Sequence, residues 1–188
     1  MKKILILIIV FSGLMVGCQN KTEEERMIEM GDKIENVGWA KPTKEISDKS
    51  IYIKYKVDDK LSIEIRIYKP NCDSSCDSST KYTAASIAYE REMDTKDKML
   101  YVGHFYDHLF QRNEGINGMS FSINSDELCY FYPDNENDTS CSEEEVQELK
   151  KLIDQSEKVL DNVGINEEEL IKYVYWKYVP DDEKMDDE

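Results

Sequence analysis

Residues 51–67 read IYIKYKVDDKLSIEIRI, and this stretch decides the fold. On each side of the central DDK, apolar side chains alternate with polar or charged ones. Alternation with a period of two is typical of a strand that has one buried and one solvated face. The stretch therefore predicts an antiparallel hairpin whose isoleucines enter the core.

The same alternation predicts how the two strands pair. A two-residue loop would place every apolar residue opposite a polar one. Pairing Val57 with Leu61 keeps the apolar faces together and sets Lys54 opposite Glu64. We therefore predict a three-residue loop over 58–60, although it contains no glycine for the left-handed position that such loops favour.

Capping boxes mark the start of three helices elsewhere in the chain. In each box a Thr, Ser or Asn stands three residues before a Glu: Thr22 and Glu25, Ser142 and Glu145, Asn166 and Glu169. The two side chains of a box satisfy backbone N–H groups that the first helical turn leaves unpaired. Apolar residues at helical spacing follow each box, and Gly38, Gly164 and Pro180 mark the three ends.

The sequence pattern determines the secondary structure of the segments between the hairpin and the helices less clearly. We expect a loop over 39–50 and a second, rich in Ser and Asp, over 71–80. Residues 81–93 and 99–110 fit either a helix or a strand. We favour two strands joined by a polar turn at 94–98.

A further hairpin is predicted around residues 124–127, followed by the two C-terminal helices. Its strands would pair Met119, Phe121 and Ile123 with Tyr132, Tyr130 and Leu128. Together these elements predict an α+β fold, with an N-terminal helix, an antiparallel β-meander and two C-terminal helices packed on the sheet. A single domain would span 22–180, followed by a solvated acidic tail over 181–188.

The first eighteen residues have the features of an export signal. Lys2 and Lys3 precede an apolar run that is too short to span a bilayer. The run ends in LMVGC over 14–18, which resembles the lipobox of bacterial lipoproteins, with Met15 in place of the usual leucine.

This resemblance implies that the segment 1–17 is removed and that Cys18 receives a diacylglyceryl group. Residues 18–21 would then form a short lipidated tether. Two acyl chains hold a domain durably on a bilayer, so the expected location is the extracytoplasmic face of a bacterial cell membrane, with the bilayer itself as a partner. The resemblance covers the signal alone and implies no family for the rest of the chain.

The charge balance excludes one class of partner. Forty acidic residues stand against 24 lysines and arginines, which gives a formal net charge of −16 for the 188-residue chain. Such a polyanion repels nucleic acid, so we expect no DNA or RNA binding. Cations, basic proteins and neutral ligands or peptides remain as candidate partners.

Four cysteines remain once Cys18 is assigned to the lipid: Cys72, Cys76, Cys129 and Cys141. Four cysteines in an exported domain allow three pairings, and the sequence cannot choose among them. Two local bridges, within 72–76 and within 129–141, are the simplest hypothesis, and free thiols remain the alternative. The second spacing is too wide for a zinc knuckle.

Both histidines of the chain lie in the short motif His104-Phe105-Tyr106-Asp107-His108. On a helix, His104 and His108 would share a face and could bind zinc, with Asp107 close by. The motif resembles the H-x-x-E-H of inverted zincins, with Asp in place of Glu. On a strand the two histidines would stand about 13 Å apart, so we favour two histidines without a metal.

A calcium site is the alternative interpretation of residues 134–145. Asp134, Glu136, Asp138 and Glu145 fall where a twelve-residue calcium loop places its ligands, together with Ser140 and Ser142. Thr139 occupies the position where the sharp turn of such a loop needs glycine. We favour a polar loop that leads into a capped helix, and expect no cofactor, with calcium as the open alternative.

Aromatic residues at the margins of the apolar stripes could form a ligand-binding surface. The candidates are Trp39, Tyr52, Tyr68 and Trp176, although Tyr and Trp also commonly lie at the rim of a core. No nucleophile elbow, P-loop or dinucleotide-binding glycine pattern is present in the sequence.

The sequence therefore favours a membrane-anchored binding or interaction module, without catalysis and with an unknown ligand. A metal-dependent hydrolase that uses His104, Asp107 and His108 is the first alternative. A passive structural role in the envelope is the second. An open sheet face lined by tyrosines would favour the binding module.

Overall fold

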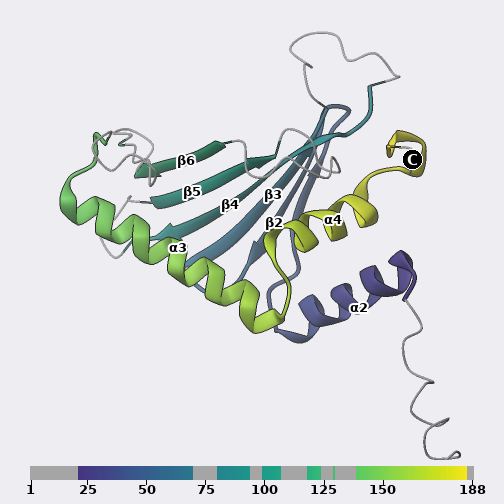
Figure 1. Cartoon of the computed structure of the whole chain (residues 1–188), viewed down its shortest axis with the longest axis horizontal. Coiled ribbons are helices and arrows are strands. Elements are labelled where there is room, and N and C mark those ends of the chain that lie inside the picture. Colours follow the sequence, from purple (N-terminus) through teal and green to yellow (C-terminus); the bar gives the residue numbers. More distant parts are fainter. Residues whose placement is uncertain are drawn as a thin grey trace, which may run out of the picture.

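The computed structural model describes residues 21–69, 80–93, 99–106, 118–123, 129 and 139–185. A six-stranded antiparallel sheet with the order β1-β2-β3-β4-β5-β6 forms one layer (Figure 1). Its strands are β1 (Thr43–Ile46), β2 (Ser50–Lys56), β3 (Leu61–Tyr68), β4 (Ala84–Glu92), β5 (Met99–Tyr106) and β6 (Gly118–Ile123). Each strand pairs with its neighbour in sequence, so the predicted α+β meander is confirmed.

The central hairpin has the register that its alternation predicts. Lys54 stands opposite Glu64, and the Val57 N–H donates to the Leu61 carbonyl at 2.9 Å. The three-residue loop needs no glycine, because the Asp58 side chain turns the chain instead. Its carboxylate accepts hydrogen bonds from the backbone N–H groups of Lys60 at 2.7 Å and Leu61 at 2.8 Å.

The three predicted helices are confirmed, each with its capping box. They are α2 (Glu23–Asn36), α3 (Glu143–Val163) and α4 (Glu167–Tyr178). In every box the Glu side chain also accepts from the N-cap backbone. Gly164 ends α3 in the left-handed region, with φ of +70°, which a residue with a Cβ rarely adopts.

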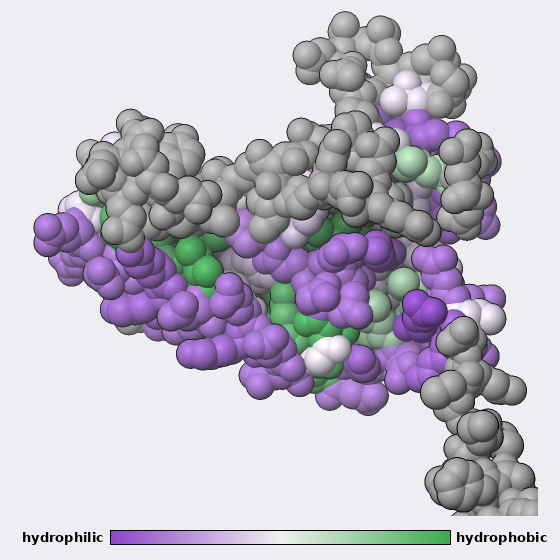
Figure 2. Space-filling model, in the orientation of Figure 1, coloured by the Kyte–Doolittle hydropathy of each residue, from purple (hydrophilic) through white to green (hydrophobic). Residues whose placement is uncertain are grey.

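The helices form a second layer on one face of the sheet. Helix α3 lies across β4 and β5, and α4 lies across β3 and β4 (Figure 1). Helix α2 packs on α4, where a Cβ added to Gly31 would stand 3.0 Å from the Tyr173 hydroxyl. Figure 2 shows that the outward side of this layer is mainly polar, with apolar residues visible between the helices.

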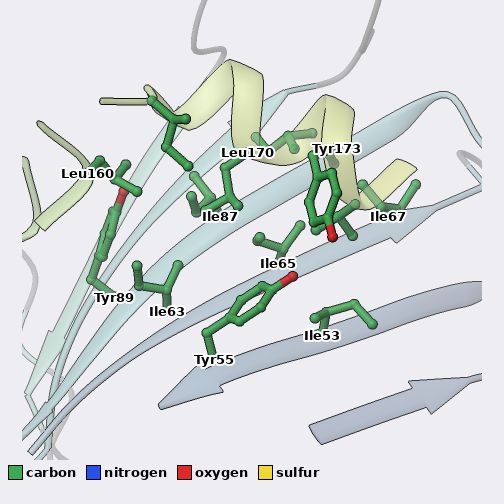
Figure 3. Packing of buried hydrophobic residues seen from close by; sticks show 14 of the residues in the cluster. Ile53, Tyr55, Ile63, Ile65, Ile67, Ile87, Tyr89, Leu160, Leu170 and Tyr173 are labelled. Carbon is green, nitrogen blue, oxygen red and sulfur yellow. The ribbon is translucent and has the colours of Figure 1, made fainter. Parts of the chain in front are cut away.

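The core lies between these two layers and is rich in isoleucine from the strands. Figure 3 shows Ile63, Ile65 and Ile67 of β3 beneath Leu170 and Tyr173 of α4. All three isoleucines have no exposed surface. The isoleucine face that the hairpin pattern predicted is therefore the face on which the helices pack.

One strand was not predicted. The expected loop over 39–50 contains β1, which pairs with β2 through Thr43 opposite Lys54 and Ile46 opposite Ile51. All four residues of β1 are exposed, so no alternation of apolar and polar residues marks it. This strand forms because its backbone pairs with β2 at the edge of the sheet. Pairing of this kind leaves no periodic pattern in the sequence, so it could not be predicted from alternation.

The two ambiguous segments form strands, as we favoured, over the part that the structure describes. β4 occupies 84–92 and β5 occupies 99–106. Of the last predicted hairpin, β6 is described and pairs with β5. Its other predicted strand falls on Leu128, Tyr130 and Tyr132, which lie outside the described residues.

The acidic segment after Pro180 is described as far as Met185, and none of the residues of its short helix is buried. A short 3-10 helix, η1 (Asp181–Glu183), folds the chain back towards the sheet. The Lys69 side chain is only 6% exposed. Its ammonium nitrogen forms an ion pair with Oε2 of Glu183 at 2.7 Å, although the angles at these two atoms do not meet those of a hydrogen bond. A buried ammonium needs a counter-ion, and the acidic segment supplies it. The Met185 N–H also donates to the Tyr175 hydroxyl of α4 at 2.7 Å.

Candidate functional site

The face of the sheet opposite α3 and α4, called here the open face, carries a connected set of charged side chains. Lys54 of β2 donates to Glu64 of β3 at 2.7 Å and to Glu90 of β4 at 2.5 Å. The Tyr52 hydroxyl donates to the same Glu64 carboxylate. The ring of Tyr52 lies 5.7 Å from the guanidinium carbon of Arg66. Three adjacent strands thus hold one polar network in a fixed register.

Burial and neighbouring charges shift the pKa values in this network. Burial raises the pKa of Glu90, and the nearby Glu64 carboxylate raises it further, against the lowering effect of Lys54. Burial lowers the pKa of Lys54, but its hydrogen bonds to the two carboxylates outweigh this and leave that pKa raised. Burial, followed by the bond to Glu64, raises the pKa of Tyr52. Perturbed titratable groups that share one surface are typical of functional sites.

A pocket of about 240 Å³ adjoins this network at the end of the sheet where β2 turns into β3. Its charged lining consists of Lys41, Lys54, Lys56, Lys60, Asp59, Glu90 and Glu92. Thr43 and Ser62 contribute hydroxyl groups, and Met99 contributes an apolar wall. The pocket therefore offers both signs of charge and hydrogen-bonding groups in a small volume.

A second polar cluster lies on the helix-covered face of the sheet, around the first residue of α4. The carboxylate of Glu167 accepts from the His104 ring Nδ1 at 2.7 Å, from the Tyr106 hydroxyl at 3.0 Å and from the Tyr89 hydroxyl at 2.9 Å. His104 and Tyr106 belong to β5, and Tyr89 belongs to β4. One side chain thus joins α4 to two strands.

The charge state of this cluster follows from its geometry. Burial raises the pKa of Glu167, but its bonds to His104, Tyr89 and Tyr106 more than offset this and leave the pKa lowered. Burial and the Glu167 charge raise the pKa values of both tyrosines. Since an ionised carboxylate can only accept, the hydrogen lies on Nδ1 of His104.

The two ring nitrogens of His104 differ in their surroundings. A carboxylate on Nδ1 leaves Nε2 available, which is the arrangement of a histidine base in catalysis. In the described part of the chain, however, Nε2 is buried and has no hydrogen-bond partner. The bonds that this structure does show, from His104, Tyr106 and Tyr89 to Glu167, join α4 to β5 and β4.

The predicted zinc residues are only partly described. His104 lies on β5 and binds Glu167, whereas Asp107 and His108 lie outside the described residues. Across the described ranges, no group of three or more His, Cys, Asp or Glu is placed to hold a metal ion.

The predicted calcium ligands Asp134, Glu136 and Asp138 also lie outside the described residues. The fourth, Glu145, has a structural role as the capping glutamate of α3. Its carboxylate accepts from the Ser142 N–H and from the Ser142 hydroxyl, each at 2.9 Å.

Of the cysteines, Cys129 and Cys141 form a disulfide, which is one of the two local bridges that the sequence favoured. Both residues belong to the buried core cluster. Cys18, Cys72 and Cys76 lie outside the described residues.

The four candidate aromatic residues do not form one surface. Tyr52 and Tyr68 point to the open face, because they alternate with the buried residues of β2 and β3. Trp39 instead packs against Tyr55, with tilted rings whose centroids are 5.7 Å apart, and Trp176 packs against the core. Tyr101 was not among the predicted aromatic residues, and its pairing with Glu90 places it on the open face.

Sequence reasoning also missed Glu90 and Glu167. The parity of β4 could have placed Glu90, had that segment been assigned firmly as a strand. Glu167 stands in a run of three acidic residues in the first turn of α4, where acidic residues are ordinary. Only the fold distinguishes it from its two neighbours.

Within the described ranges, no helix combines the length and the apolar character needed to cross a bilayer. No protein-family model, curated protein or solved structure matches this chain. The function is therefore argued from the residues and their geometry.

Proposed function

We propose that this protein is a lipid-anchored extracytoplasmic binding module that takes its ligand on the open face of the sheet. The observation that carries the proposal is the half-buried network of Tyr52, Lys54, Glu64 and Glu90 beside a pocket of about 240 Å³. The proposal includes no catalysis.

The unfavourable dehydration of the charged groups in this network supports a binding role. Removing a charged group from water is unfavourable unless a partner compensates for the lost hydration. The side chains of Glu64 and Glu90 are only 14% and 18% exposed, although this face has no packed helix among the described elements. A domain that needed charge only for solubility could leave these carboxylates fully hydrated. Fixed, partly dehydrated charges can instead be pre-organised for a ligand.

The binding experiment uses one probe from each chemical class: trialanine, maltotriose, spermidine and inorganic phosphate. At least one of them should raise the unfolding midpoint of the purified full chain, because a ligand that binds only the folded state stabilises it. Glu90→Gln preserves the shape of the site and should reduce this shift. Asp154→Asn, on the exposed side of α3, should preserve it. No shift with any probe at millimolar concentration, or an equal shift in both variants, would contradict the proposal.

The anchor is tested separately. Cys18→Ser removes the thiol that would carry the lipid, so this variant should leave the membrane fraction for the soluble fraction after export. Metabolic labelling with a radioactive fatty acid should mark the wild-type chain and spare the variant. A Cys18→Ser variant that still sediments wholly with membranes would argue against lipid anchoring.

A further inference from the structure

The charges that line the open-face pocket are sorted by strand. Lys54 and Lys56 belong to β2, and the N–H of Ala40, next to Lys41, bonds to the Lys56 carbonyl at 3.1 Å. Glu90 and Glu92 belong to β4. The strand residues therefore give the pocket a lysine side over β1 and β2 and a glutamate side over β4. The loop between β2 and β3 adds Asp59 beside Lys56, and Lys60, whose carbonyl accepts from the Glu92 N–H at 3.0 Å.

The register fixes the distance between the two sides. Lys56 pairs with Ser62 of β3, and Ser62 pairs with Glu90 of β4. Neighbouring strands lie about 4.8 Å apart, so the backbones that carry the two charged sides are separated by about 10 Å. The Ser62 hydroxyl group lies on β3, between the two charged sides of the pocket.

Lys54 and Glu90 already form an ion pair with each other across β3. The charged side chains at the rim of the pocket are not part of this pair. Lys41, Lys56 and Glu92 are all exposed at the rim of the pocket. The Lys56 ammonium lies 3.7 Å from the Asp59 carboxylate, which is longer than a hydrogen bond. These rim charges can turn to a ligand without breaking the network below them.

We infer that the pocket binds a zwitterion, specifically a short peptide with free termini. Its carboxylate would meet Lys41 and Lys56, and its ammonium group would meet Glu92 at the opposite side. This inference rests on the proposed function and names the ligand class of the same site.

The mixed lining suits a ligand that carries both signs of charge. Its four ammonium groups attract a ligand carboxylate, and its three carboxylates attract a ligand ammonium group. A ligand with one charge of each sign satisfies both sides. The volume of about 240 Å³ lies below the range of sites for drug-sized molecules, which suits a peptide of two or three small residues.

Calorimetry on the full chain purified in detergent tests the inference with three probes. Trialanine carries both charges, N-acetyl-trialanine lacks the ammonium group, and trialanine amide lacks the carboxylate. Trialanine should bind, and each blocked peptide should bind about tenfold more weakly or worse, because each loses a charge-assisted hydrogen bond.

Two rim variants then assign each end of the peptide. Lys56→Gln should weaken binding of trialanine and leave binding of its amide unchanged, since the amide has no carboxylate for the lysine side. Glu92→Gln should weaken trialanine and leave N-acetyl-trialanine unchanged. Lys158→Gln and Asp154→Asn, both exposed on α3, are the matched controls and should bind all three peptides as the wild type does.

The outcomes separate this inference from the broader proposal. If trialanine gives no heat at millimolar concentration, or if the blocked peptides bind equally well, the zwitterion inference is overturned. Binding of maltotriose that Glu90→Gln weakens would then leave the binding module standing. Trialanine binding that no open-face variant changes would contradict the inference and the proposed location of the site together.

Discussion

Replacing Glu167 with alanine should lower the free energy of unfolding by about 3–5 kcal/mol, measured by urea denaturation at neutral pH. The Glu167 carboxylate accepts hydrogen bonds from His104, Tyr89 and Tyr106, and its side chain is only 20% exposed. Alanine would leave one imidazole and two phenols without their acceptor. Each such group costs about 1–3 kcal/mol when it is buried and unsatisfied.

Glu168→Ala is the matched control for this change. Glu168 is the next residue in the first turn of α4, so it shares the interaction with the helix dipole. Its side chain is 64% exposed and, among the described residues, forms an ion pair only with Lys172, at 2.6 Å. Loss of an exposed pair costs up to about 1 kcal/mol. Equal effects of the two substitutions would show that the interaction with the helix dipole, and not the cluster, explains the role of Glu167.

The same cluster predicts the direction of a pH effect. The pKa of Glu167 is lower in the folded protein than its ordinary value of 4.5. Its stabilising contribution is therefore complete above that ordinary value and is lost as the pH falls through the lowered folded pKa. Between pH 6 and about pH 3, stability should fall less steeply in Glu167→Gln than in the wild type or in Glu168→Gln.

The sequence predicts those elements whose signal is local. Alternation in 51–67 records which face of β2 and β3 is buried, and parity alone then sets the register. A capping box is equally local, because its two side chains bond to the backbone within one turn. For this reason the helix starts at Thr22, Ser142 and Asn166 were predicted correctly.

The elements that were missed depend on partners far away in the sequence. β1 exists because β2 offers an unpaired edge, and its residues Thr43–Ile46 carry no pattern of their own. The role of Glu167 depends on side chains from β4 and β5, about 60 to 80 residues earlier. The ion pair of Glu183 with the buried Lys69 was likewise not predicted, because the two residues are remote in sequence. Composition shows that acids are abundant and cannot show which ones the fold uses.

Ile65→Ala should lower the free energy of unfolding by about 2–5 kcal/mol, measured by the same denaturation. Ile65 has no exposed surface and stands on β3, the strand that pairs with both β2 and β4. Its direct neighbours across the sheet are Ile53 and Ile87, and helix α4 covers it from above (Figure 3). Three of its sides are thus fixed by paired backbone or a packed helix, so the structure cannot close fully around the missing atoms. The cost therefore includes a cavity term in addition to the lost transfer of apolar atoms from water.

Ile46→Ala makes the same chemical change at the edge of the same sheet. Ile46 is 62% exposed on β1, so the change opens no cavity and should cost less than about 1 kcal/mol, the span of strand propensity. The difference between the two variants isolates burial, because residue type, substitution and secondary structure are identical. The hairpin pattern predicted that Ile65 is buried and recorded nothing about Ile46. Comparable losses at both positions would mean that β1 is anchored by more than its backbone pairing, and that the face assigned from the alternation does not carry most of the stability.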